Sequence, residues 1–216
     1  MKIRLKIKRQ DRFETYEVPY KEGMTLLDAL KYIKEYIDPS LAFRQFCGAG
    51  ICGTCAINVN GFPKLICKEQ ALSYALDENP TVLEPLNNAE VVKDLVIDTS
   101  NMSYRIKAYK AWITPIETNL KIDQELSKKI EESSDCILCY ACQSFCPEVA
   151  DKGYAGPLFF AKLYRLFIDP RDREHGIRLL EAKDGLILHC LSCNKCNNAC
   201  PKEVKPATLI RELLNS

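Results

Sequence analysis

All twelve cysteines of this 216-residue chain fall into three groups of four, and each group has the spacing of iron–sulfur cluster ligands. The first group follows a C-x4-C-x2-C pattern, and its fourth cysteine lies further along the chain. Its members are Cys47, Cys52, Cys55 and Cys67. This is the plant-type spacing, so we expect these four thiolates to hold a 2Fe-2S cluster.

The other two groups share the pattern C-x2-C-x2-C-x3-C-P, which is typical of bacterial ferredoxins. Three closely spaced thiolates reach three irons of a cubane, and in two-cluster proteins the cysteine before proline binds the other cluster. The expected ligands of one 4Fe-4S cluster are Cys136, Cys139, Cys142 and Cys200, and those of a second are Cys146, Cys190, Cys193 and Cys196. This exchange joins distant segments, so we expect the form without clusters to be poorly folded.

Two other uses of the cysteines are weighed against this interpretation. Disulfides are disfavoured by the closely spaced triplets and by the expected reducing compartment. Structural zinc favours two separated C-x2-C pairs over a triplet followed by C-P. Iron content decides among the three possibilities.

The residues around the first group predict a domain of strands with one helix. Residues 2–8 alternate aliphatic and charged side chains at strand period, and residues 14–18 follow as a second strand. Thr25 is an expected N-cap, and Leu26, Leu30, Ile33 and Ile37 would line one face of the helix that follows.

The cluster loop and a hairpin complete this first domain. Gly48, Gly50 and Gly53 permit unusual dihedrals that bring backbone N–H groups close to cluster sulfurs, so we count them as cofactor-binding residues. Asn60-Gly61 is a strong hairpin signal. We therefore expect an α+β chain whose residues 1–102 form a β-grasp ferredoxin domain of the plant type.

The second half has helical periodicity. Apolar residues recur on one face over residues 158–167, and again over residues 209–214, after Pro206 at an expected first helical turn. The connection over residues 93–115 should be partly helical, and Trp112 should lie in the core. We expect residues 103–216 to form an all-α domain of the bacterial two-cluster ferredoxin kind.

The composition argues against nucleic-acid binding, secretion and a membrane-spanning helix. A formal net charge of +1 gives no reason to expect nucleic-acid binding. The first residues lack the apolar core of a secretory signal, and no stretch approaches the ~18 apolar residues of a transmembrane helix. We expect a cytoplasmic chain without a transmembrane segment, which reaches the cytoplasmic face of a membrane only through partner subunits.

Several segments give the chain a specific resemblance to a known family, the iron–sulfur subunits of succinate dehydrogenases and fumarate reductases. The order of a plant-type domain before a two-cluster helical domain is that family's architecture. The similar segments are residues 52–61 (CGTCAINVNG), 93–98 (KDLVID), 136–139 (CILC), 156–165 (GPLFFAKLYR) and 169–172 (DPRD).

The resemblance implies a function in electron transfer. In that family a separate flavoprotein subunit with FAD oxidises succinate or reduces fumarate, and the iron–sulfur subunit carries single electrons along three clusters. The acceptor or donor at the far end is a quinone or a low-potential partner. The chain itself would hold no catalytic acid, base or nucleophile.

The chain also departs from the family pattern near the third cluster. Cys193 stands where most members lack cysteine and carry a 3Fe-4S cluster, so we expect a second 4Fe-4S cluster, with 3Fe-4S as the alternative if Cys193 is not a ligand. The stretch 148–151 (EVAD) replaces a tryptophan pair of the family's quinone pocket, and Leu191 replaces a histidine of that pocket. Gly48 and Ala49 replace a charged pair beside the first cluster.

These departures leave several partners and roles open. With four cysteines in its third motif, the chain resembles two subfamilies, the thiol:fumarate reductases and the archaeal-type succinate dehydrogenases. The far partner would then be a cysteine-rich subunit of the heterodisulfide-reductase kind, and otherwise a membrane anchor. The alternatives are an electron-transfer subunit of another flavin oxidoreductase, such as a glycolate-oxidase-like enzyme, or a free-standing ferredoxin-type carrier.

Overall fold

The chain divides into two structural units, which a computed structural model describes for residues 1–74, 79–116, 120–150 and 153–216. The N-terminal unit contains residues 1–98 together with the short segment 137–141. The C-terminal unit contains residues 99–136 and 142–216. The division lies between Asp98 and Thr99, whereas the expected boundary after residue 102 falls inside helix α2 (Ser100–Ala108).

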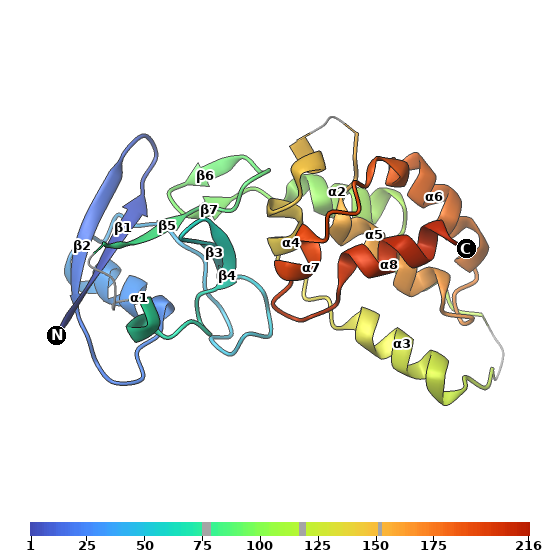
Figure 1. The fold of residues 1–216 in the computed structure, drawn as a ribbon, viewed down its shortest axis with the longest axis horizontal. Coiled ribbons are helices and arrows are strands. Elements are labelled where there is room, and N and C mark those ends of the chain that lie inside the picture. The colour runs from blue at the N-terminus through green and yellow to red at the C-terminus, as the bar shows by residue number, and fades with distance from the viewer. Residues whose placement is uncertain (75–78, 117–119, 151–152) are drawn as a thin grey trace. The chain divides into compact units, whose positions relative to one another are not determined.

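A five-stranded mixed sheet forms the frame of the N-terminal unit, with the order β2-β1-β5-β3-β4 (Figure 1). The strands are β1 (Lys2–Lys8), β2 (Phe13–Pro19), β3 (Ala56–Val59), β4 (Phe62–Leu65) and β5 (Thr81–Glu84). β1 is antiparallel to β2 and parallel to β5, and β3 is antiparallel to both β4 and β5. The two strands expected near the N-terminus are confirmed.

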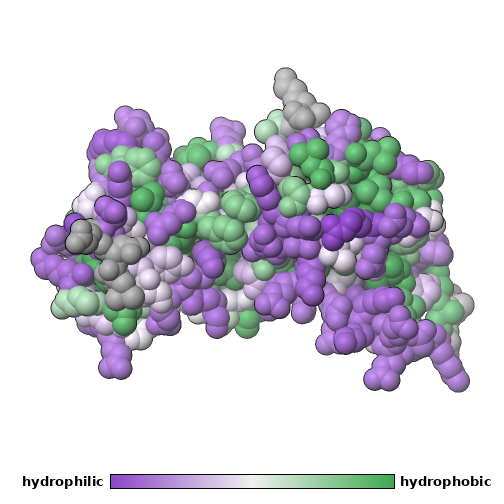
Figure 2. Space-filling model, viewed as in Figure 1, coloured by the Kyte–Doolittle hydropathy of each residue, from purple (hydrophilic) through white to green (hydrophobic). Residues whose placement is uncertain are grey.

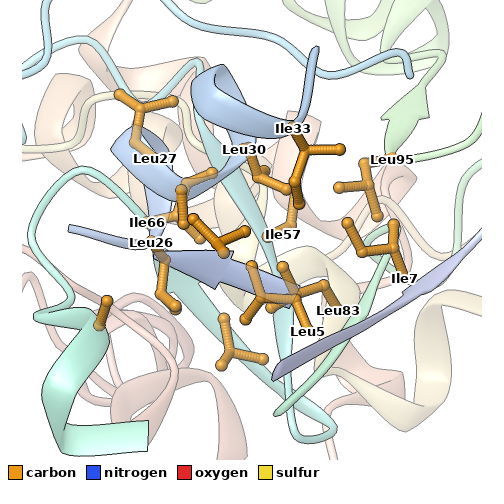
Figure 3. Packing of buried hydrophobic residues seen from close by; sticks show 14 of the residues in the cluster. Leu5, Ile7, Leu26, Leu27, Leu30, Ile33, Ile57, Ile66, Leu83 and Leu95 are labelled. Carbon is orange, nitrogen blue, oxygen red and sulfur yellow. The ribbon is translucent and has the colours of Figure 1, made fainter. Parts of the chain in front are cut away.

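Helix α1 (Leu26–Tyr36) packs its apolar face on this sheet. Figure 3 shows Leu27, Leu30 and Ile33 of the helix above side chains of the strands. Thr25 is the N-cap, and its hydroxyl accepts a hydrogen bond from the backbone of Asp28 in a capping box. Ile37 does not belong to the buried face, because it is the C-cap residue and is 46% exposed.

Two turns in the N-terminal unit depend on left-handed backbone. Asn60 (φ 50°) and Gly61 (φ 78°) join β3 to β4, so the expected two-residue hairpin is confirmed. Asp94 (φ 49°) joins β6 (Val91–Lys93) to β7 (Val96–Ile97), a second sheet of two strands. A short 3-10 helix, η1 (Ala71–Tyr74), lies between β4 and β5.

Asp94 is also the buried partner of Arg9. Its carboxylate accepts hydrogen bonds from Arg9 Nε at 2.9 Å and from the Ala42 backbone at 2.9 Å, and the Asp94 side chain is only 2% exposed. Arg9 also donates to Tyr16 and Glu14 on β2. This network fixes the segment that leads out of the N-terminal unit against β1 and β2.

The C-terminal unit is helical. Besides α2, its helices are α3 (Gln124–Ser134), α4 (Ala141–Ser144), α5 (Pro157–Phe167), α6 (Arg178–Asp184), α7 (Lys195–Asn198) and α8 (Pro206–Leu214), and its 3-10 turns are η2 (Pro147–Ala150), η3 (His175–Ile177) and η4 (Ile187–His189). α5 is the central helix and packs against α2, α3, α6 and α8 (Figure 1).

The two expected apolar stripes form α5 and α8. Leu158, Ala161 and Tyr164 are buried on α5, whereas Phe167 at its end is half-buried. The prediction for Trp112 is wrong, because its side chain is 49% exposed. Its backbone carbonyl accepts a hydrogen bond from the buried Arg178.

Helix α3 carries charged side chains on its exposed face, and Figure 2 shows hydrophilic atoms over it. Only Ile130 and Ser133 of this helix are buried. Across the part of the chain that the structure describes, no helix is both long enough and apolar enough to cross a membrane.

A buried ion pair joins three segments of the C-terminal unit. Arg178 and Asp172 are both fully buried, and Arg178 Nε donates to Asp172 Oδ2 at 2.9 Å. Arg178 also donates to the carbonyls of Tyr109 and Trp112, while Asp172 Oδ1 accepts from the Thr114 backbone at 2.9 Å. These hydrogen bonds hold the segment after α2 against the start of α6.

Replacing Arg178 tests how much this buried ion pair contributes to stability. Arg178→Met leaves the Asp172 carboxylate buried without its cation, so we expect the free energy of unfolding to fall by about 3–5 kcal/mol. The matched control is Lys129→Met, because Lys129 is half-exposed in its pair with Glu125 and should cost less than about 1 kcal/mol. Anaerobic urea denaturation of the cluster-loaded chain measures both, and equal losses would contradict this account.

Candidate iron–sulfur sites

The structure brings the four cysteines of the first group together in the N-terminal unit. The Cys47 thiol shares a hydrogen bond with Cys52, and Cys55 lies beside both Cys52 and Cys67. The local fold explains the last contact, because β3 begins directly after Cys55 and β4 ends two residues before Cys67. The hairpin therefore carries the distant fourth cysteine back to the loop.

Backbone N–H groups face the sulfurs of this group. Ala49 N and Cys52 N donate to Cys47 Sγ at 3.4 and 3.3 Å, and these bonds lower the pKa of the exposed Cys47 thiol to about 6. Burial raises the pKa of Cys55 to about 12, although the Cys67 backbone donates to it. The exposed end of the loop thus stabilises a thiolate, and the buried end needs a metal to displace its proton.

The three glycines of this loop all have positive φ, at 66° for Gly48 and 72° for both Gly50 and Gly53. Gly53 also permits a close approach. A Cβ there would lie 2.7 Å from the Cβ and 2.9 Å from the Cα of Cys139, which belongs to the second cysteine group. The first cluster loop and Cys139 are therefore in backbone contact within the N-terminal unit.

The four cysteines expected to hold the third cluster line one cavity of the C-terminal unit. Cys146, Cys190, Cys193 and Cys196 all contribute to its wall. Cys146 precedes η2, whereas the other three surround the start of α7. The fold thus joins the fourth cysteine of one motif to the first three of the other.

Burial and hydrogen bonds give these thiols different properties. Cys196 is buried beside the other three cysteines, and this burial raises its pKa to about 12. Burial also raises the pKa of Cys146, against the effect of N–H donors from Glu148 and Val149. Cys193 is exposed at the mouth of the site. Donors to sulfur and a thiolate set of four fit a cubane cluster.

The remaining set of four cysteines is divided between the two units. Cys139 lies in the N-terminal unit, and Cys136, Cys142 and Cys200 lie in the C-terminal unit. Cys142 lies on α4, whereas Cys200 follows α7. The assignment of this set to one cluster therefore depends on the spacing of its cysteines.

The two C-x2-C-x2-C loops share an unusual backbone. Leu138 (φ 55°) and Tyr140 (φ 70°) flank Cys139 with left-handed conformations, and Ser192 (φ 52°) and Asn194 (φ 59°) flank Cys193 in the same way. Non-glycine residues rarely adopt this conformation, and it costs about 1 kcal/mol or more each. Cys193 therefore occupies the same place in its loop as Cys139 does in the other.

All twelve cysteines lie within the described residues, and no disulfide joins any two of them. Within those described ranges, no three His, Cys, Asp or Glu side chains converge closely enough to hold a single metal ion. The ligands of a cluster bind different irons, so they are spaced more widely than the ligands of one ion.

Tyr154 is the residue of the third site that the sequence did not single out. It lines the cavity together with Cys190 and the other three cysteines, and it is 4% exposed. Its position follows from the path of the chain between η2 and α5, and no cysteine pattern or periodicity marks it.

Two domain families match the chain. A 2Fe-2S iron–sulfur cluster binding domain matches residues 2–104, and a 4Fe-4S dicluster domain matches residues 132–204. These matches cover the three cysteine groups described above.

Relatives and solved structures agree with the domain matches. The chain is 35% identical to the fumarate reductase iron–sulfur subunit of Mycobacterium tuberculosis, over 97% of this chain and 87% of that protein. It is 32% identical to a subunit of the CoM/CoB fumarate reductase of Methanothermobacter marburgensis, over 93% of this chain and 40% of that protein. A chain of the Mycobacterium smegmatis Sdh1 complex in the apo form superposes with a TM-score of 0.89 at 25% identity, over 99% of this chain and 94% of that one.

Coverage differs between the two kinds of relative. The chain spans most of the Mycobacterium tuberculosis protein, whereas it spans only about two fifths of the length of the methanogen relatives that it matches. The mycobacterial similarity is sufficient to assign the family: the chain belongs to the iron–sulfur subunits of fumarate reductases and succinate dehydrogenases.

Proposed function

We propose that this chain relays single electrons between a partner subunit that carries FAD and a second redox partner, as a subunit of a succinate- or fumarate-converting oxidoreductase. Membership of the family and the matched 2Fe-2S and dicluster domains support this role. The substrate chemistry then takes place on the flavin of the partner, and the residues of this chain hold and tune clusters.

The ligand sets follow from the cysteine groups. The 2Fe-2S cluster is held by Cys47, Cys52, Cys55 and Cys67 in a plant-type β-grasp ferredoxin domain, for which the mixed sheet and α1 are suitable. A 4Fe-4S cluster is held by Cys136, Cys139, Cys142 and Cys200, and the third cluster is held by Cys146, Cys190, Cys193 and Cys196. Each cluster, when bound, accepts and releases one electron.

The contact of Gly53 with Cys139 supports a relay between the first two clusters. Only glycine fits at residue 53, because any Cβ would strike the backbone of Cys139. The loop of the first cluster thereby adjoins a ligand of the second without an intervening side chain. In the order of the relay, the 2Fe-2S cluster is nearest the flavin and the Cys190 cluster is farthest from it.

The geometry of Cys193 is the main support for the type of the third cluster. Cys193 lines the same cavity as the other three cysteines, and its loop repeats the left-handed pattern around Cys139. This supports a fourth ligand and a 4Fe-4S cluster. The loss of an iron to form a 3Fe-4S cluster is the alternative.

The second redox partner is either a membrane-anchor subunit or a cysteine-rich subunit of the heterodisulfide-reductase kind. A fourth ligand at the third cluster favours the latter, since 4Fe-4S clusters span low potentials. The relative from Methanothermobacter marburgensis, which is named as part of a CoM/CoB fumarate reductase, points in the same direction. Leu191 and Glu148 line the cavity where the family's quinone-site residues would stand.

Electron paramagnetic resonance of the oxidised protein, purified anaerobically, tests the cluster content. Oxidised 2Fe-2S and 4Fe-4S clusters are silent, so we expect no signal together with roughly ten irons per chain. Zinc in place of iron would overturn the proposed function. A full-strength 3Fe-4S signal would show instead that Cys193 is not a ligand.

Removing Cys193 tests its role directly. Cys193→Ala leaves three thiolates, so we expect a 3Fe-4S signal in the oxidised protein and a loss of about one iron per chain. Ser192→Gly is the matched control. Glycine readily adopts the left-handed backbone of residue 192, and the substitution leaves every expected ligand in place. If Cys193→Ala stays silent with unchanged iron, the assignment of the fourth ligand is wrong.

A further inference from the structure

We propose that Tyr154 sets the reduction potential of the third cluster by donating a hydrogen bond from its hydroxyl to the sulfur of Cys190. This inference rests on the proposed ligation of that cluster by Cys146, Cys190, Cys193 and Cys196. It makes Tyr154 a positioning residue, which acts on the cluster through one of its ligands.

The hydroxyl of Tyr154 lies where it can influence the whole site. Tyr154 lines the cavity together with Cys146, Cys190 and Cys196, three of the four expected ligands. The side chain is 4% exposed, so little water competes for the hydroxyl proton. Among the residues described at this cavity, Tyr154 supplies a side-chain hydroxyl, whereas Cys146 receives backbone N–H groups.

The surrounding structure fixes this hydroxyl in place. The ring of Tyr154 packs against Phe160 of α5, with ring centroids 5.4 Å apart. The next residue, Ala155, donates its N–H to the Gly185 carbonyl at 3.0 Å and accepts from the Gln143 side chain at 2.9 Å. The backbone on the C-terminal side of Tyr154 is therefore held from two directions, and the ring has little freedom to turn away.

The electrochemical effect follows from charge. When the cluster accepts one electron, part of the added negative charge resides on its ligand sulfurs. A donor O–H stabilises that reduced form more than the oxidised form, so it raises the potential.

The test is a redox titration of the cluster-loaded full chain, or of the complex with which it copurifies, followed by electron paramagnetic resonance. Tyr154→Phe removes only the hydroxyl and keeps the ring against Phe160. We expect its third cluster to have a lower potential, so that the ratio of oxidised to reduced cluster at a fixed potential rises about tenfold, or about 59 mV for one electron.

The matched control is Tyr164→Phe in the same unit. Tyr164 is also 4% exposed, but its hydroxyl donates to Glu212 of α8 and it does not line the cavity. This variant should lose stability and leave the potential unchanged. An unchanged or raised potential in Tyr154→Phe, with the third cluster fully loaded, would overturn the inference and assign Tyr154 a purely structural role.

A second variant covers the case in which Tyr154→Phe fails to load the cluster. Site-specific replacement of Tyr154 by 3-fluorotyrosine keeps the hydroxyl and makes it a stronger donor, so the potential should rise. No rise would overturn the inference. Failure of the proposed function is distinguished by the unsubstituted chain, because absence of a third cluster there removes the ligand set itself.

Discussion

Four cysteines from distant parts of the chain meet around a common space in the C-terminal unit. In the C-terminal unit the space is the cavity lined by Cys146 and by the loop from Cys190 to Cys196. Helices α5 and α8 pack side by side and provide the frame for it. Because four neighbouring thiolates repel one another, the arrangement depends on the metal that the cavity is suited to hold.

Two ion pairs stabilise connecting segments that contribute few apolar side chains to the core. Asp94 and Arg9 do so where the chain leaves the N-terminal unit, and Asp172 and Arg178 do so between α2 and α6. In the first pair the second oxygen of Asp94 accepts a hydrogen bond from the Ala42 backbone. In the second pair both partners bond backbone atoms of the segment after α2. The segments around Asp94 and Asp172, which resemble the family, therefore have a structural explanation that does not involve the clusters directly.

The left-handed residues in the two cubane loops show how local strain serves the sites. In each loop the residues on both sides of the middle cysteine have left-handed backbone, so the chain turns sharply there. Glycine would make these turns easily, yet the chain places Leu138 and Tyr140 in one loop and Ser192 in the other. Such strain persists only where the surroundings hold it, and a bound cluster is well suited to do so.

Local sequence patterns were enough to predict the cluster chemistry, the first two strands, the helix capped by Thr25 and the Asn60-Gly61 turn, because spacing, period and capping are local properties. They placed Trp112 in the core wrongly, since periodicity does not reveal which side of a loop faces solvent. The position of Tyr154 in the same cavity as Cys190 and the full burial of Arg178 became visible only in the folded chain, as did the approach of Cys139 to Gly53. These contacts join residues far apart in the chain, and the packing of whole elements, which no local pattern encodes, brings them together.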